Sequence, residues 1–471
     1  MILGKVFDRF ARYSPVTVMM RGVMEFVFPP SRLDELFREH ASQQYEDQLL
    51  FSTVVDTLAL AVDGTRKSVN AAYQASKNDF TVSVTALYDK LQGVETNVSQ
   101  AMVRESAERL APVIKALKAE VKPLLPGFHT KIIDGNHLEG TDHRIDETRT
   151  ISSKPLPGHS LVVLDPQLRL AIDAFPCEDA YTQERLLLPQ VLKTVKAFDL
   201  WMADRNFCTT GFVFGIDDRG AFFLIRQHAS TLSNKKLLGR RRRIGRCKTG
   251  MVYEQTLEIH NPNATDPAAA TMQLRRITIK LDEPTRDGDT VLHIVTNVPE
   301  EAADAITLAE LYRERWSIEY AFQELGQALR GEVNTLCYPK AALLAFCVAL
   351  LSYNLLSVIK AATRSAHKDP SLLMDLSGYY LAEEVAAIYG GMMIAIERRH
   401  WTKAFARLTA TELARLLKQL AANVNVSRFK KHKRGLKKPP PKRTGGLRKK
   451  HVSTKRLLDQ RATKKLQSTT A

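Results

Sequence analysis

The chain of 471 residues is too long for one ordinary domain, so two or three units are expected. Hydrophobic residues make up 44% of it, which excludes a wholly disordered protein. The formal net charge is +17, but 17 of the 68 basic residues and only one of the 51 acidic residues lie between Arg428 and the end. The rest of the chain therefore has 51 basic and 50 acidic residues, and the basicity belongs to a C-terminal tail.

The five cysteines bear on the cellular compartment. They are odd in number and contain no C-x-x-C pair, which argues against a disulfide framework and against a structural zinc site. No secretory signal is evident at the N-terminus. We therefore expect a cytoplasmic protein.

Residues 1–125 have a helical pattern. Ser31 to Asp34 offers polar side chains that can cap a helix start. Thr81–Leu91 and Asn97–Leu117 are predicted as two helices separated by Gly93, an arrangement similar to a helix–turn–helix. Most such pairs are ordinary helical hairpins, so this pattern favours binding of DNA ends by an N-terminal helical domain only modestly.

An α/β pattern starts at residue 126, in a second domain predicted to reach residue 425. Apolar runs bounded by turn residues predict four strands, with a helix before the last one. The strands are His129–Asp134, Ser160–Leu164, Leu168–Phe175 and Phe198–Ala203, and the helix is Asp179–Val195. Asp134 ends the first strand and Asp204 follows the last, so two carboxylates are expected at strand ends.

Residues 207–303 form a mainly β insertion by their pattern. Phe212–Ile216 and Ala221–Ile225 flank turn residues and predict a hairpin. Three further strands are predicted, at Met251–Ile259, Leu274–Leu281 and Val291–Thr296.

A basic loop is predicted inside this insertion, at Arg240–Arg243 with Arg246 and Lys248 nearby. Such a run is usually a solvated turn. In a DNA enzyme it would more often contact phosphate, which makes Arg241 and Arg242 candidate DNA-binding residues.

Thr307–Leu329 is predicted as one helix with a continuous apolar stripe. Tyr312, Arg315 and Glu319 are spaced three and four residues apart and lie along the flank of that stripe. We expect these three side chains at the edge of the core, in a cleft.

Residues Ala341–Ile359 contain no charge over 19 positions, which is long enough for a membrane span. The segment contains Ser352 and Asn354, stands alone and follows the Glu319 helix. A buried helix packed on that helix is the better interpretation, and a role in a membrane is not expected.

The C-terminal segment, residues 426–471, combines basic residues with Pro439–Pro441 and with Gly445 and Gly446. This composition cannot bury a core, so a flexible, disordered tail is predicted. Lys437 and Lys438 are candidate DNA contacts in it, with a salt-sensitive and non-specific contribution. A tail that only aids solubility, or an arm that binds RNA, would have the same composition.

Asp134, Asp204 and Glu319 together carry the strongest chemical signal. Carboxylate oxygens are the preferred ligands of Mg²⁺, and two such ions assist phosphodiester cleavage in many enzymes. Taken singly, Asp134 is a turn former, Asp204 a local ion-pair partner of Arg205, and Glu319 one half of a helical i,i+4 pair. Their joint placement at strand ends and on a core-edge helix favours a metal site.

At these residues the sequence resembles the bacterial DDE transposases of the insertion-sequence "four" type, which carry a Tyr-Arg-Glu-Lys signature. The resemblance rests on Asp134-Gly-Asn, on Ala203-Asp-Arg-Asn-Phe-Cys208 and on Tyr312-Arg-Glu-Arg-Trp-Ser-Ile-Glu319, and it covers about residues 129–360. It implies a ribonuclease-H-like catalytic core with a β insertion, in keeping with the predicted order of elements.

The resemblance also implies a function. Asp134, Asp204 and Glu319 would hold two ions of Mg²⁺ or Mn²⁺, and Tyr312 and Arg315 would contact phosphates near the cleaved end. The partners would be double-stranded DNA, both as terminal inverted repeats and as target, and a second copy of the chain in a synaptic homodimer. The location would be the bacterial cytoplasm, at the nucleoid when DNA is bound.

The sequence departs from the family at one position. The family has Lys seven residues after the Glu, where this chain has Gly326. Gln327 or Arg330 could replace that contact with phosphate. The departure bears on activity more than on fold, and it leaves a metal-dependent nuclease of the same fold, or an inactive DNA-binding derivative, as alternatives.

Overall fold

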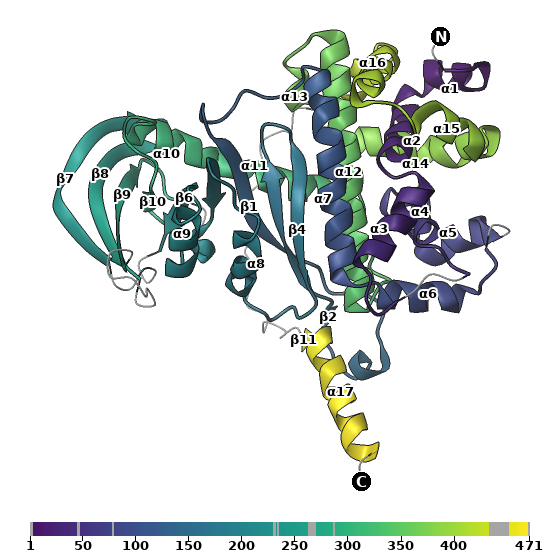
Figure 1. Ribbon diagram of the computed structural model, residues 1–471, viewed down its shortest axis with the longest axis horizontal. Helices are drawn as coiled ribbons and strands as arrows, with labels where there is room; N and C mark the ends of the chain where they lie inside the picture. Colours follow the sequence, from purple (N-terminus) through teal and green to yellow (C-terminus); the bar gives the residue numbers. More distant parts are fainter. Residues whose placement is uncertain are drawn as a thin grey trace.

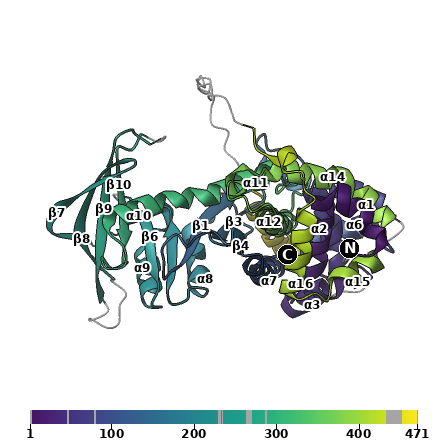
Figure 2. The ribbon, with the colours of Figure 1, turned by 90° about the horizontal axis from the view of Figure 1, so that it is seen from above.

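The computed structural model describes residues 3–44, 48–77, 80–228, 232, 235–261, 270–285, 288–432 and 452–469. Within these residues, a nine-stranded sheet has the order β4-β3-β1-β5-β6-β10-β9-β8-β7. Helices pack against the β4 end of the sheet, and the opposite end is a curved β extension (Figures 1 and 2).

Five strands make up the first half of the sheet. They are β1 (His129–His137), β3 (His159–Asp165), β4 (Leu170–Cys177), β5 (Asp199–Ala203) and β6 (Phe222–Gln227). β1 pairs antiparallel with β3 and parallel with β5, and β5 pairs parallel with β6. Thus β4, β3 and β1 pair antiparallel with one another in that order, and β5 and β6 run parallel to β1.

The predicted hairpin at Phe212–Ile216 and Ala221–Ile225 is wrong, because the first segment is helix α9 (Thr210–Asp217). The Thr209 side chain caps this helix by accepting a hydrogen bond from the backbone N–H of Phe212, at 3.3 Å. Since β5 and β6 are parallel, their connection has to cross back over the sheet, which a two-strand hairpin cannot do.

The predicted β insertion continues the same sheet. Its strands are β7 (Lys235–Cys247), β8 (Gly250–His260), β9 (Thr271–Leu281) and β10 (Val291–Thr296), and β10 pairs antiparallel with β6. The basic loop predicted at Arg240–Arg243 is instead part of β7, which pairs with β8 on both sides of an irregularity between Leu238 and Arg242. These arginines are exposed on an edge strand, where charge also discourages pairing with another sheet.

The two faces of the sheet are covered differently. Ile133 and other alternate residues of the strands pack with α8 (Leu188–Leu192) and α9, whereas Ile132 faces the cluster that contains α7 (Thr96–Ala116) and α12 (Pro339–His367). α8 is much shorter than the helix predicted at Asp179–Val195. The Asp179 side chain accepts a hydrogen bond from the backbone N–H of Tyr181, at 3.0 Å, and such local bonds compete with helix formation.

Both ends of the chain contribute to one helical half. Its other helices are α1 (Asp8–Tyr13), α2 (Pro15–Val27), α3 (Pro30–His40), α4 (Phe51–Val62), α5 (Val69–Ala75), α6 (Val84–Gly93), α13 (Leu372–Asp375), α14 (Gly378–Ala395), α15 (Arg398–Phe405) and α16 (Ala410–Ala421). Every residue of α2 is buried, and the rings of Phe7 and Trp401 meet edge to face at 4.9 Å. Residues 1–125 therefore share a hydrophobic core with the C-terminal helices.

The pair α6 and α7 corresponds to the predicted helix–turn–helix-like segment. Its second helix packs on β4 and α12 and buries nine residues, including Met102, Leu110 and Val113. A recognition helix needs an exposed face that can enter a DNA groove. Because α7 is committed to the sheet and α6 also packs on α12, both helices of this segment are core helices.

α12 is long and apolar enough to cross a membrane, but its most apolar window is 100% buried inside the protein. Asn354 is fully buried and bonds the strand β4, since its Oδ1 accepts from the N–H of Ala171 at 2.8 Å and its Nδ2 donates to the carbonyl of Ala171 at 2.9 Å. The packing is that of a core helix, as predicted.

The predicted flexible tail is wrong for residues 452–469. Val452–Ser453 form β11, which pairs with β2 (Pro155–Leu156), and Thr454–Thr469 form α17. Arg456 Nε contacts Asp179 Oδ2 at 2.6 Å, and Arg461 pairs with Glu147. Acidic groups on the body thus hold a basic helix in a segment that the composition predicted to be disordered. Lys437 and Lys438 lie outside the described residues.

Candidate active site

Asp134 and Asp204 lie side by side where two parallel strands separate. The last paired residues of β1 and β5 are Ile133 and Ala203, so each aspartate is the next residue of its strand. β1 continues to His137 in its pairing with β3, which places Asp134 inside the strand rather than at its end. The N–H of Gly135 donates to Asp134 Oδ1 at 2.9 Å, and Asp204 caps the 3-10 turn Arg205–Phe207.

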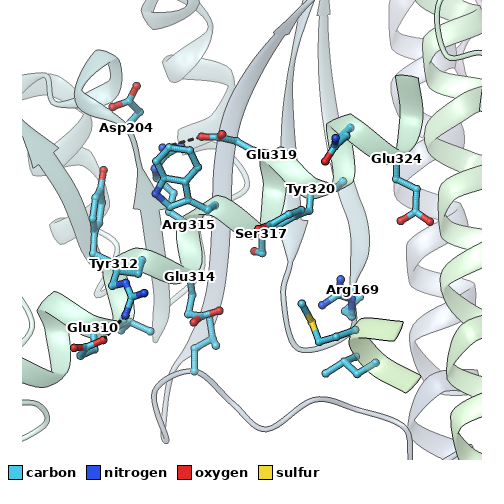
Figure 3. Close-up of a pocket in the computed structure, with 18 of the residues that line it drawn as sticks. Arg169, Asp204, Glu310, Tyr312, Glu314, Arg315, Ser317, Glu319, Tyr320 and Glu324 are labelled. Atoms are coloured by element: carbon cyan, nitrogen blue, oxygen red, sulfur yellow. Dashed lines mark hydrogen bonds and ion pairs between the residues drawn. The ribbon is translucent and has the colours of Figure 1, made fainter. Parts of the chain in front are cut away.

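The predicted helix at Thr307–Leu329 is divided by a 3-10 turn. α10 (Ala305–Arg313) is followed by η7 (Glu314–Trp316) and then by α11 (Ser317–Gln327). This tighter turn rotates the second half relative to the first, and 3-10 segments inside helices often mark functional sites. Figure 3 shows Tyr312, Arg315 and Glu319 on this segment, facing Asp204.

Arg315 joins two of the three predicted carboxylates. Its Nη1 donates to Asp134 Oδ2 at 2.9 Å, and its Nη2 donates to Glu319 Oε1 at 3.1 Å. The Arg315 side chain is buried, and the charges of Asp134, Asp204 and Glu319 all act on it. One guanidinium thus stands among the three carboxylates that the sequence analysis singled out.

Tyr312 is buried and donates its hydroxyl hydrogen to the carbonyl oxygen of Ala203 at 3.3 Å. This bond fixes α10 to the end of β5, one residue before Asp204. Burial raises the pKa of Tyr312, so its hydroxyl stays protonated. The residue therefore positions the helix against the strand that carries Asp204.

The electrostatics of Asp134 reflect opposing influences. Burial is the largest and raises its pKa to about 6, and the charges of Asp204 and Glu184 act in the same direction. Arg315 and the N–H of Gly135 lower it. Burial lowers the pKa of Arg315, but the nearby acidic groups outweigh it and raise that pKa overall.

The carboxylates fit a divalent cation by their chemistry. Oxygen donors suit Mg²⁺ and Mn²⁺, and three acidic groups already act on a single positive group, Arg315. Among the described residues, no three His, Cys, Asp or Glu side chains stand close enough to form a metal site as arranged. Asp134, Asp204 and Glu319 would hold an ion only after Arg315 turned away.

A cleft of about 2360 Å³ opens beside these residues. Asp204, Tyr312, Arg315 and Glu319 line one part of it, and the cleft extends along α11 toward α12 and the start of α14. Trp316 and Tyr320, 54% and 63% exposed, also line it. Its size suits an extended ligand better than a small metabolite.

Arg330, Arg241 and Arg242, which were also predicted to bind DNA, are not among the residues that line the cleft. Arg330 bonds the helical half through its backbone N–H to Val62, at 2.8 Å, and its side chain reaches the carbonyl of Arg66 at 3.4 Å. Arg241 stacks on Tyr253, and Arg242 pairs with Glu254 at 3.0 Å, both on the β extension. A Cβ at Gly326 would meet no atom within 4 Å, so that position faces open space.

The structure also adds residues that the sequence analysis missed. Arg169, Lys360, Arg364 and Lys431 line the same cleft as Asp204 and Glu319. They come from the turn before β4, from α12 and from the segment after α16, so no spacing in the sequence links them.

Comparison with known proteins finds a family model that matches the region of these residues. Residues 131–355 match the family model described as a transposase DDE domain. The match supports a DDE transposase. It begins in the strand that carries Asp134, and it contains Asp204, the β extension and Glu319.

Neither of two further comparisons extends this result. No curated protein matches the chain. Among solved structures, a piggyBac transposase synaptic complex with hairpin DNA is similar over 85% of this chain and 87% of that one, at 11% identity and a TM-score of 0.37.

Proposed function

We propose that the protein is a transposase that binds the ends of its own insertion element and catalyses metal-dependent DNA cleavage and strand transfer. The observation that carries the proposal is the meeting of Asp134, Arg315 and Glu319 beside Asp204, inside the region that matches the transposase DDE domain. A ribonuclease-H-like catalytic core is part of this proposal, and the sheet order β4-β3-β1-β5-β6 supports it.

The proposed partners are double-stranded DNA and a second copy of the chain, in the bacterial cytoplasm. The cleft provides length and charge for a DNA strand, and the arginines of β7 provide an exposed basic edge. Phosphate contacts of this kind position a duplex without reading its sequence.

Asp134, Asp204 and Glu319 would hold Mg²⁺ or Mn²⁺, which when bound would neutralise charge at the attacking and leaving oxygens. The chain's own residues prepare the site. Tyr312 fixes α10 to β5, and Arg315 balances the carboxylates while they hold no ion. Once released, the Arg315 guanidinium would be free to pair with a phosphate of the bound strand.

The test uses duplexes that carry the DNA flanking the coding region, with Mg²⁺, resolved on denaturing gels. Asp134→Asn, Asp204→Asn and Glu319→Gln are each expected to lower cleavage about 1,000-fold, since losing a charged ligand removes about 4 kcal/mol of transition-state stabilisation. Asp218→Asn changes an exposed acid of the turn after α9 and serves as the control. Normal cleavage by any of the three variants would remove that residue from the site.

The same reaction separates the alternatives. Cleavage with joined product supports a transposase, and cleavage alone supports a nuclease of the same fold. Binding without cleavage by the unmodified protein supports an inactive DNA-binding derivative, for which Gly326 is the motivating observation.

A further inference from the structure

Four basic side chains gather in the part of the cleft beyond α11. They are Arg169, Lys360, Arg364 and Lys431, and they line the same continuous cleft as the carboxylates. Figure 3 shows Arg169 below Glu324, at the opposite side of the view from Asp204. We refer to these four residues as the distal basic cluster.

The distal basic cluster is poorly neutralised. Lys360 pairs with Glu324, and Arg364 donates to the carbonyl of Ala119. In the part of the chain that the structure describes, the side chains of Arg169 and Lys431 have no hydrogen bond and no ion pair. Four cations therefore share one paired carboxylate.

The like charges of the cluster act on one another. Burial lowers the pKa of Lys431, and the charges of Lys360 and Arg169 lower it further, while those of Glu324 and Asp375 act in the opposite direction. Burial also lowers the pKa of Arg364, with Arg169 as the second cause. Like charges held together cost free energy in the unliganded protein, and a bound anion would remove that cost.

The fold holds Arg169 in place at some cost. Its backbone has a φ of +58°, a left-handed conformation that costs a residue with a side chain about 1–2 kcal/mol. The preceding turn is organised by Asp165, whose Oδ1 accepts from the N–H groups of Gln167 and Leu168 at 2.8 and 2.9 Å. Arg169 is thus presented to the cleft by a defined turn.

Aromatic side chains border the same region. Tyr379, 45% exposed, and Tyr380 line the cleft, and Tyr380 meets the ring of His432 edge to face at 5.9 Å. Cations beside exposed aromatic rings are the usual lining of grooves that follow a nucleic-acid backbone. A small anion would need only one of these groups, whereas the cleft offers several along its length.

We propose that the distal basic cluster binds backbone phosphates of DNA at a site separate from the carboxylate centre. This inference rests on the proposed function, because the ligand is the DNA that would enter the same cleft. It assigns Arg169 and Lys431 as the principal contacts and Glu324 as the acid that limits binding through Lys360.

The test measures binding of the full-length chain to a 30-base-pair duplex of mixed sequence, in EDTA, by fluorescence anisotropy over a range of NaCl. Each phosphate contact contributes about 0.9 to the slope of log Kobs against log salt. Arg169→Asn with Lys431→Gln is expected to reduce the slope by about 1.8, and Lys431→Gln alone by about 0.9. Asparagine is chosen because it tolerates a positive φ.

The control removes two positive charges outside the cleft. Lys115→Gln with Lys403→Gln changes exposed residues of α7 and α15 and is expected to leave the slope unchanged. An unchanged slope in the Arg169/Lys431 variant, or an equal loss in the control, would overturn the site. Glu324→Gln should strengthen binding, and weaker binding by that variant would contradict its assigned role.

A parallel cleavage reaction of the unmodified protein with Mg²⁺ keeps the two proposals distinct. The expected change in salt slope without any cleavage would leave the distal basic cluster standing and overturn the transposase. Cleavage together with an unchanged slope would do the reverse.

Discussion

We expect the Asn354 side chain of α12 to stabilise the edge of the sheet by bonding the outward backbone groups of β4. β4 is the last strand of the sheet, so the N–H and C=O of Ala171 that point outward have no further strand to pair with. Both groups are bonded by the Asn354 amide, whose Nδ2 also donates to Ser106 Oγ at 2.9 Å. Ala171 and Ser106 are buried, which keeps water from replacing the amide.

The change Asn354→Leu keeps the approximate volume and removes these bonds. Two backbone groups of Ala171 would then be buried without partners, at about 1–3 kcal/mol each, or about 4 kcal/mol together. For a chain of this length, the entropy of unfolding is about 1 kcal/mol per degree near the midpoint. The variant is therefore expected to melt about 4 °C below the unmodified protein.

Differential scanning calorimetry at pH 7 measures this shift. Thr363→Val is the matched control, because Thr363 is also buried on α12 but its hydroxyl bonds only the carbonyl of Ile359 in the same helix. It should lower the midpoint by about 1 °C, as expected for one lost hydrogen bond. Equal shifts in the two variants would show that the strand edge does not depend on the amide.

Three further outcomes follow from the structure. Burial raises the pKa of Asp63 to about 7, so the folded protein keeps a proton that the unfolded chain loses above about pH 4. The free energy of unfolding therefore falls between pH 4 and pH 7 because of this group. Measured by urea unfolding, Asp63→Asn should be more stable than the unmodified protein by up to about 4 kcal/mol at pH 8 and unchanged at pH 4. Gly250→Ala would place a Cβ 2.0 Å from a backbone carbonyl oxygen of β9 and should lower the melting temperature by about 1–3 °C, whereas Gly211→Ala, which meets nothing within 4 Å, should not. Asp179→Asn weakens the contact that holds α17, and trypsin should cleave that helix up to about fivefold faster; an unchanged rate would show that Asp179 does not hold it.

The strands and the long helices were predictable because they depend on local pattern. The strands at β1, β3, β4, β5 and β8 to β10 have apolar runs bounded by turn residues, and α12 has a long uncharged run. α9 was not predictable in this way. Its β-rich composition favours a strand, but the parallel pairing of β5 with β6 requires a crossover, and that requirement appears only in the assembled sheet.

The candidate site, too, could be predicted from the sequence only where it depends on local pattern. Asp134 and Asp204 could be expected together because each follows a predicted strand, and parallel strands bring equivalent ends to one edge. Glu319 could be placed on a core-edge helix by periodicity. The bond from Arg315 to Asp134 spans 181 residues and depends on how η7 turns α11 toward β1, which no spacing in the sequence expresses.

The charge of the body shows why composition alone does not reveal the distal basic cluster. Outside the tail the basic and acidic residues almost cancel, which predicts a body with little attraction for DNA. The fold separates them: Arg169, Lys360 and Arg364 meet in the cleft, where Glu324 pairs with Lys360. A phosphate within about 8 Å, the Debye length at physiological salt, responds to these local charges and not to the net charge of the chain. Removing the tail should therefore weaken binding to DNA without abolishing it, because the cleft retains a positive field of its own.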